Sequence, residues 1–170
     1  LAINPNPLSE TWRNLAIARQ TRSVFLSMLG ISWLWFFGAV FLTQFAPFAK
    51  DVLHANAQVV TLLLAVFSIG IAMGSLLCEK MSGHAVEIGL VPFGSIGMTL
   101  FGLDLWWSST TAQALTPTTV HTIATFLQQP SNWRVLVDLF GMAVFAGLYS
   151  VPLYAMIQTR CQASHRSRII

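Results

Sequence analysis

The chain has 170 residues, of which 55% are hydrophobic and only 9% are charged. With a mean hydropathy of +0.66, this composition excludes an ordinary soluble domain, whose surface would need more charged residues. The net charge of +3 does not indicate nucleic-acid binding, because the Arg residues cluster beside apolar stretches rather than on one solvated face. The two cysteines, Cys78 and Cys161, lack the spacing of a zinc site or a disulfide framework.

Residues 1–23 are predicted to form a cytoplasmic linker followed by a helix on the membrane surface. Asn and Pro alternate before Pro7, as is typical of a linker. In the helix that follows, Trp12 and Leu15 can touch the membrane while Arg13 faces phosphates. Three Arg residues in this leader and the long apolar run behind it argue against a secretory signal. The missing initiator Met leads us to expect a fragment of a longer protein.

Residues 24–157 are predicted to be a transmembrane region of four helices. Each of the four apolar runs is near the length that a helix needs to cross about 30 Å of hydrocarbon. Unbroken apolar runs favour helices over a barrel, whose strands would alternate. The predicted fold class is therefore an all-α membrane protein. The expected crossings are Val24–Phe45, Val59–Leu77, Ile88–Trp107 and Trp133–Ile157.

The basic residues predict the orientation of these crossings. The positive-inside rule places the side with more Lys and Arg in the cytoplasm. Lys50 and Arg134 fall on the opposite side, and Trp106, Trp107 and Trp133 mark its headgroup layer. Both ends of the chain, including the basic segment 158–170, are therefore expected in the cytoplasm. The residues on the basic side are Arg13, Arg19, Arg22, Lys80, Arg160, Arg166 and Arg168.

Residues 108–132 are predicted to be a long outer loop. Val120, Ile123, Ala124 and Leu127 recur in it at helical spacing, between Pro117 and Pro130. This segment is too short to cross the membrane. We expect a helix lying on the outer surface, with a plain loop as the alternative.

Small residues predict close packing between the helices. Gly70 and Gly74 form a small-xxx-small face on the second crossing, and Gly94, Gly97 and Gly102 line the third. Such glycines allow two backbones to approach closely, although they are also common in membrane helices without this role. Their density favours a multi-helix bundle over a loose anchor.

Four polar side chains are candidates for a substrate path, because ionisable groups inside a membrane are costly and often functional. Asp104 and Asp138 lie within the third and fourth crossings. Arg134, four residues before Asp138, is expected to pair with it on one helix face. Gln44 lies near the outer end of the first crossing, where it can bind a ligand or hold a helix contact. For both acids, an interfacial or structural-pair role is favoured over a role in a substrate path.

No motif of an enzyme, cofactor or metal site is present. The sequence lacks a phosphate-binding P-loop, a GxSxG nucleophile elbow and an HExxH metal pair. No His is followed by Asp at the HxxxxD spacing of glycerolipid acyltransferases. We therefore expect this chain itself not to be an enzyme and to bind no cofactor.

The segment Gly74-Ser75-Leu76-Leu77-Cys78-Glu79-Lys80-Met81-Ser82-Gly83 resembles the G-x-x-x-D-[RK]-x-G-[RK] loop of the major facilitator superfamily, with its acid and base one position later. Gly74, Glu79, Lys80 and Gly83 are accordingly candidates for a conformational loop. Three further stretches resemble the lysophospholipid transporter branch, especially bacterial members fused to a glycerophospholipid acyltransferase. They are Ile31-Ser32-Trp33 with Phe37-Gly38-Ala39, Val86-Glu87-Ile88-Gly89-Leu90-Val91-Pro92, and Val151-Pro152-Leu153-Tyr154-Ala155.

This resemblance implies that the chain supplies helices seven to ten of a twelve-helix transporter, in the C-terminal half of the fold. The implied function is to move lysophospholipids of the 2-acyl-glycerophosphoethanolamine type across the bacterial inner membrane for reacylation. The implied partners are the lipid bilayer, the lysophospholipid, the remaining helices and a fused acyltransferase domain. Two alternatives stay open: the membrane region of a bifunctional acyltransferase, and a passive anchor or assembly module.

Overall fold

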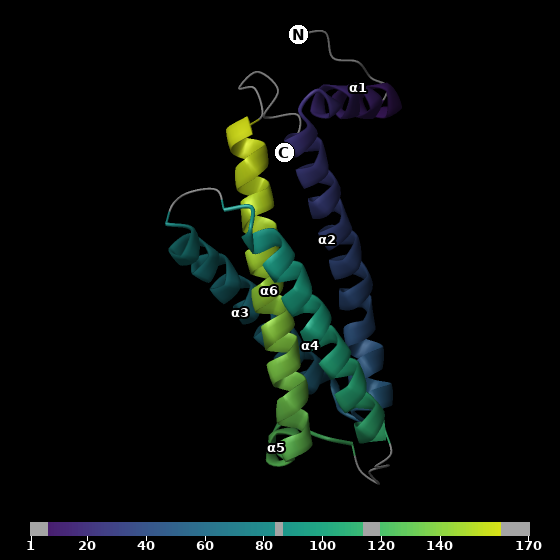
Figure 1. Ribbon diagram of the computed structural model, residues 1–170. Helices are drawn as coiled ribbons and strands as arrows, with labels where there is room; N and C mark the ends of the chain where they lie inside the picture. Colours follow the sequence, from purple (N-terminus) through teal and green to yellow (C-terminus); the bar gives the residue numbers. More distant parts are fainter. Residues whose placement is uncertain (1–6, 84–86, 114–119, 161–170) are drawn as a thin grey trace.

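The computed structural model describes residues 7–83, 87–113 and 120–160, and within them every regular element is a helix. Four helices are long and apolar enough to span a membrane, which confirms an all-α membrane protein. Figure 1 shows these four running along the long axis, with α1 lying across one end. The elements are α1 (Pro7–Arg19), α2 (Arg22–Pro47), the π-helical turn η1 (Phe48–Val52), α3 (Ala57–Ser82), α4 (Leu90–Gln113), α5 (Ile123–Gln128) and α6 (Pro130–Arg160).

The spanning helices are longer than the apolar runs that predicted them. Helix α2 passes through Pro47 into η1, so that the span covers Arg22–Val52. Pro47 lies inside this continuous span, where it cannot donate a backbone hydrogen bond to the preceding turn. Helix α3 begins at Asn56, whose side chain accepts hydrogen bonds from the backbone N–H groups of Gln58 and Val59.

The predicted loop 108–132 is wrong at both ends, because α4 continues to Gln113 and α6 begins at Pro130. The helix continues through a polar stretch because the Ser and Thr hydroxyls at the end of α4 donate hydrogen bonds to carbonyls of the same helix. Ser109 donates to the Trp106 carbonyl at 2.8 Å, and Thr110 donates to the Trp107 carbonyl at 2.7 Å. Pro117 lies outside the described residues.

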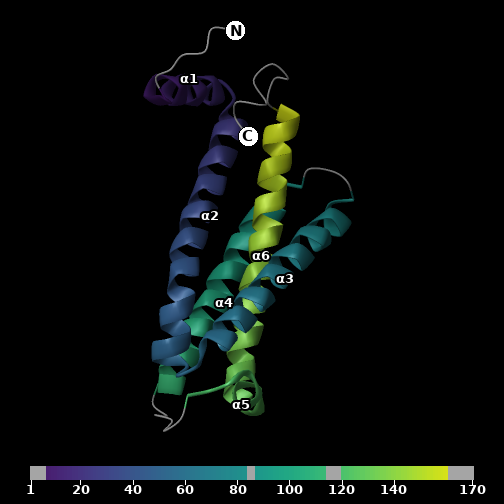
Figure 2. The same ribbon diagram turned by 180° about the vertical axis from the view of Figure 1, so that it is seen from behind.

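Within the stretch where a surface helix was expected, α5 covers only six residues. Thr122 and Thr125 form a capping box at its start, and Val120 precedes it. The segment before α5 is held against the start of α3, since the His121 N–H donates to the His54 carbonyl at 2.8 Å. Helix α5 lies at the end of the bundle opposite α1 (Figure 2).

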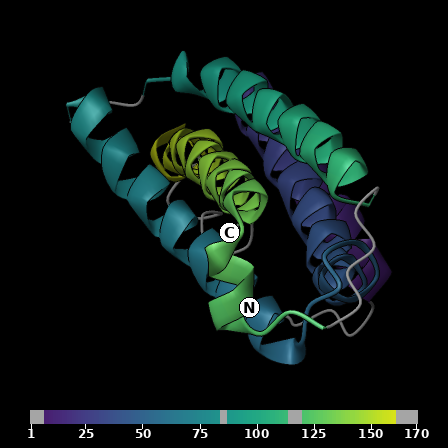
Figure 3. The same cartoon turned by 90° about the horizontal axis from the view of Figure 1, so that it is seen from below.

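Helix α6 is the packing centre of the bundle. Of its most apolar 18-residue window, 56% is buried, compared with 28% in α3 and 17% in α2 and α4. Viewed from the α5 end, α6 lies between α3 on one side and α4 and α2 on the other (Figure 3). The other three helices therefore meet chiefly through α6.

Four of the glycines predicted to pack lie closely against α6. A Cβ on Gly74 would come 2.0 Å from the Val144 carbonyl oxygen, and one on Gly70 would come 2.7 Å from the Ala143 Cβ. On α4, a Cβ on Gly94 would lie 2.8 Å from the Tyr149 nitrogen, and one on Gly97 would lie 2.1 Å from the Phe145 ring. Only glycine permits these helix–helix distances.

Candidate functional site

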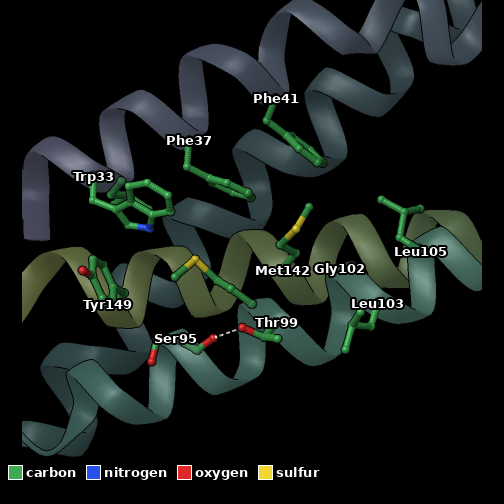
Figure 4. A pocket seen from close by; sticks show the side chains of 12 residues that line it. Trp33, Phe37, Phe41, Ser95, Thr99, Gly102, Leu103, Leu105, Met142 and Tyr149 are labelled. Atoms are coloured by element: carbon green, nitrogen blue, oxygen red, sulfur yellow. Dashed lines mark hydrogen bonds between the residues drawn. The ribbon is translucent and has the colours of Figure 1, made fainter.

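A groove lies between α2 and α4, with α6 as its floor (Figure 4). Its volume is about 440 Å³, within the range of pockets that hold small organic molecules. Both flanking helices are long and apolar enough to span a membrane, so the groove lies within the membrane-spanning part of the bundle. Its lining residues are Trp33, Leu34, Phe37 and Phe41 of α2, Ser95, Met98, Thr99, Gly102, Leu103 and Leu105 of α4, and Met142 and Tyr149 of α6.

The groove is lined mainly by hydrocarbon, although Ser95 and Thr99 carry hydroxyls. The Ser95 hydroxyl donates to the Pro92 carbonyl at 2.9 Å, and the Thr99 hydroxyl donates to the Ser95 carbonyl at 2.8 Å. Both hydroxyls therefore use their protons within α4. The groove suits an apolar chain better than a polar solute.

The two ends of the groove differ. At the end nearer α1, the Tyr149 hydroxyl donates to the Gly30 carbonyl at 3.3 Å, and a Cβ on Gly30 would lie 2.9 Å from Leu153. Helices α2 and α6 are in contact there. At the end nearer α5, the groove adjoins a smaller cavity of about 80 Å³ through the shared residues Phe41 and Leu105. Gln44 is exposed and lines this smaller cavity with its hydrocarbon atoms, because the cavity wall has no polar surface.

The other three substrate-path candidates come together at the α4–α6 contact, in the half of the molecule nearer α5. Arg134 makes a two-pronged ion pair with Asp104, in which Nε donates to Oδ2 at 3.0 Å and the second nitrogen donates to Oδ1. The predicted pairing of Arg134 with Asp138 is therefore wrong. Arg134 reaches across to α4, where both of its prongs find a carboxylate oxygen.

Asp138 instead faces inward and is only 2% exposed. The Ser108 hydroxyl of α4 lies 3.3 Å from Asp138 Oδ2 and 3.0 Å from the Leu105 carbonyl oxygen. The ion pair beside it is partly exposed, and Trp106, Trp107 and Trp133 are exposed in the same region. This setting is typical of the headgroup layer, where charged groups keep contact with water.

The charged cluster does not line the groove: Asp104, Arg134 and Asp138 are all absent from its walls. Asp104 is two residues beyond the groove residue Gly102, and two residues on a helix turn through about 200°. Asp104 therefore projects from the other side of α4. Of the four predicted candidates, only Gln44 lies on the cavity system.

The groove residues Ser95, Thr99 and Tyr149 were not among the predicted candidates. Hydroxyl groups occur throughout these apolar helices, and several bond only to their own backbone. The sequence held no signal that separated the groove residues from the others.

The predicted conformational-loop residues lie at the end of the molecule where α1 is found. Gly83 ends α3 with a positive φ of 54°, a conformation that glycine adopts without strain. Glu79 and Lys80 are exposed in the last turn of α3, whereas Gly74 is packed against α6. Residues 84–86 of this loop, like residues 161–170 of the basic segment, lie outside the described part of the chain.

Among the described residues, no group of three His, Cys, Asp or Glu side chains is arranged to hold a metal ion. Comparisons with protein-family models, with curated proteins and with solved structures give no match.

Proposed function

We propose that this chain is part of a transporter of the major facilitator superfamily that moves lysophospholipids across the bacterial inner membrane for reacylation. The observation that carries the proposal is the hydrocarbon-lined groove between two spanning helices. An amphiphile can enter such a groove sideways from the bilayer without exposing its acyl chain to water.

The ends of the groove support a specific placement of the substrate. The acyl chain lies along the walls formed by α2 and α4, and the headgroup lies at the end nearer α5, where exposed Trp side chains and an exposed ion pair are found. The Asp104–Arg134 pair and Asp138 support the bundle from the other side of α4. The positive-inside rule places α1 and the end of α6 in the cytoplasm.

Blocking the groove tests this proposal. Gly102 lines the groove, and a Cβ there would meet only the Met142 sulfur at 3.8 Å, so Gly102→Trp would extend its indole into the groove. We expect uptake of labelled lysophosphatidylethanolamine by spheroplasts that produce the full-length protein containing this chain to fall at least about tenfold, the effect of losing about 1.4 kcal/mol of transition-state stabilisation.

Gly38→Trp is the matched control, because Gly38 lies on α2 outside the groove and a Cβ there would meet nothing within 4 Å. It adds the same bulk to a spanning helix and should leave uptake unchanged. Equal uptake in all three proteins would refute the proposed path. If uptake also survives deletion of residues 24–157, a passive anchor is favoured. If the deletion abolishes acyltransferase activity, the membrane region of a bifunctional acyltransferase is favoured.

A further inference from the structure

Helix α2 changes its geometry at the end nearer α5. Pro47 has no N–H to donate to the Thr43 carbonyl, and the π-helical turn η1 follows it directly. At this turn the Leu53 N–H donates to the Phe48 carbonyl at 3.1 Å, so the hydrogen bond spans one residue more than in an α-helix. Helices bend at prolines and at π-turns, and a few residues at the end of an element can act as a hinge.

This end of α2 is fixed to the rest of the bundle. Ala49 and Leu53 are fully or almost fully buried, in a cluster that also contains Leu63 of α3, Phe126 of α5 and Leu139 of α6. The Ala49 carbonyl also accepts a hydrogen bond from the Ala55 N–H at 2.8 Å. The turn therefore keeps its place against these helices if the rest of α2 moves.

Towards α1, two hydrogen bonds join α2 to α6. The Tyr149 hydroxyl donates to the Gly30 carbonyl at 3.3 Å, and the Trp35 Nε1–H donates to the Tyr154 hydroxyl at 2.8 Å. These two bonds form the tyrosine latch. Helices have no hydrophobic driving force to associate within lipid, so hydrogen bonds and close packing hold such a contact together.

The contact of α2 with α6 differs from those of α3 and α4. A Cβ on Gly30 of α2 would meet side-chain atoms of Leu153 and Tyr149. A Cβ on Gly74 of α3 or Gly94 of α4 would meet backbone atoms of α6. Side chains can change rotamer, whereas a backbone atom moves only with its helix. The α2–α6 contact is therefore the one that can open while α3, α4 and α6 stay together.

We propose that α2 is a gate, which pivots at the turn formed by Pro47 and η1 and is held shut by the tyrosine latch. Opening moves the α1 end of α2 away from α6 and widens the groove between α2 and α4. The groove residues Trp33, Phe37 and Phe41 lie on the swinging part of α2 (Figure 4). The gate is built from contacts within the bundle, so it does not depend on the molecule that is transported.

The distance from the pivot makes a small rotation sufficient. Along the helix, Leu26 is about 30 Å from Pro47, whereas Phe45 is about 3 Å from it. A rotation of about 10° therefore moves Leu26 by about 5 Å and Phe45 by only about 0.5 Å. The buried Phe45 ring can keep its edge contact with Phe67 of α3 while the far end of α2 swings.

The test measures distances between pairs of spin labels by double electron–electron resonance. It uses the full-length protein containing this chain, in nanodiscs, with its native cysteines changed to Ser. The gate pair combines Leu26→Cys of α2 with Thr159→Cys of α6. One reference pair combines Leu76→Cys of α3 with Thr159→Cys, and the other combines Ala46→Cys, beside the pivot, with Val137→Cys of α6. All five positions are exposed.

Tyr149→Phe together with Trp35→Phe removes both donors of the latch. We expect a population in which the gate distance is longer by about 5 Å, the displacement for a rotation of about 10°, while both reference distances stay unchanged. Each single variant should show the longer distance in a smaller fraction of molecules. The single variants keep the test decisive if the double variant does not fold.

Trp33→Phe together with Ser150→Ala is the matched control. It also removes an indole from α2 and a hydroxyl from α6, but the Ser150 hydroxyl donates to the Gly147 carbonyl of its own helix at 3.2 Å. The gate distance should stay that of the unmodified protein. Adding Pro47→Ala to the latch variant tests the pivot, because it restores a backbone donor there and should shrink the longer-distance population.

Three results would overturn the gate: gate distances that stay fixed in the latch variants, reference distances that lengthen together with the gate distance, and a control that opens as far as the latch variants. These measurements need no substrate, so their outcome is separate from uptake. Fixed gate distances overturn the gate even if Gly102→Trp abolishes uptake. A moving gate with uptake that ignores Gly102→Trp supports the gate and refutes the proposed path.

Discussion

At the scale of single residues, the charged side chains of the spanning helices are placed to limit the cost of holding charge in a membrane. Asp138 is 2% exposed, and its carboxyl lies beside the Ser108 hydroxyl and the carboxyl of Asp104. Arg134 binds Asp104 with two nitrogens. The guanidinium therefore offsets chiefly the charge of Asp104, beside which the Asp138 carboxyl is buried.

This arrangement predicts which acid is energetically coupled to Arg134. Arg134→Gln and Asp104→Asn should each lower the thermal stability of the protein in detergent. Each single change breaks the same ion pair. The thermal stability of the double variant should therefore be close to that of the less stable single variant. Thermal unfolding of the two single variants and the double variant measures this coupling.

A second double-mutant cycle serves as the control and combines Arg134→Gln with Asp138→Asn. Asp138→Asn preserves the shape of the side chain. Asp138 makes no ion pair with Arg134 in the structure, so the effects of Arg134→Gln and Asp138→Asn should be closer to additive. A larger coupling of Arg134 to Asp138 than to Asp104 would contradict the observed pairing.

At the scale of helices, α6 is held between two glycine faces. The α3 face approaches the backbone of α6 at Phe140 and Val144, and the α4 face approaches it at Phe145 and Tyr149. The relation is mutual on the α3 side, because a Cβ on Gly147 of α6 would lie 2.7 Å from the Ile71 carbonyl oxygen. Without a hydrophobic driving force between helices in lipid, such close packing is what orders the bundle.

Gly74→Ala tests this packing directly. Its Cβ would overlap the Val144 carbonyl, a backbone atom that can move only if α3 and α6 separate. We expect a loss of about 1–3 kcal/mol in the free energy of unfolding, the usual cost of overpacking. Denaturation in mixed micelles, followed by circular dichroism, measures it.

Gly38→Ala is the control, because it makes the same substitution in a spanning helix with open space around the new methyl group. The intrinsic helix propensity of Ala makes it neutral or stabilising. A similar loss of stability in both variants would show that the substitution acts through the helix itself rather than through the α3–α6 contact.

The sequence carried enough information to predict these spans and their packing glycines, but not the groove. Length and composition suffice for a crossing, and glycine spacing marks a close contact. By contrast, Leu34 and Leu103 line the groove while Leu29 and Leu100 do not, although the residue type is the same. In lipid both faces of a helix are apolar, so polarity cannot indicate which face meets its neighbour.

At the scale of the whole molecule, the bundle has two chemically different ends. Helix α1 lies across one end, close to the start of α2, and α3 and α6 also finish there (Figure 1). Arg19, Arg22, Lys80 and Arg160 belong to this end, and all four are exposed. Helix α2 begins three residues after α1, and a position of α1 along the membrane surface stays a prediction.

Single cysteines can test this topology in whole cells, after Cys78 and Cys161 are changed to Ser. Gln20 lies between α1 and α2, Thr159 lies in the last turn of α6, and Gln128 ends α5 at the opposite end. All three are exposed. With four crossings, Gln20→Cys and Thr159→Cys must face one compartment and Gln128→Cys the other.

Since the positive-inside rule places Gln20 in the cytoplasm, a membrane-impermeant maleimide added to spheroplasts should label only Gln128→Cys. Permeabilised cells should label all three. Labelling of Gln20→Cys alone would contradict an even number of crossings, whereas labelling of Gln20→Cys and Thr159→Cys without Gln128→Cys would keep the fold and reverse its orientation.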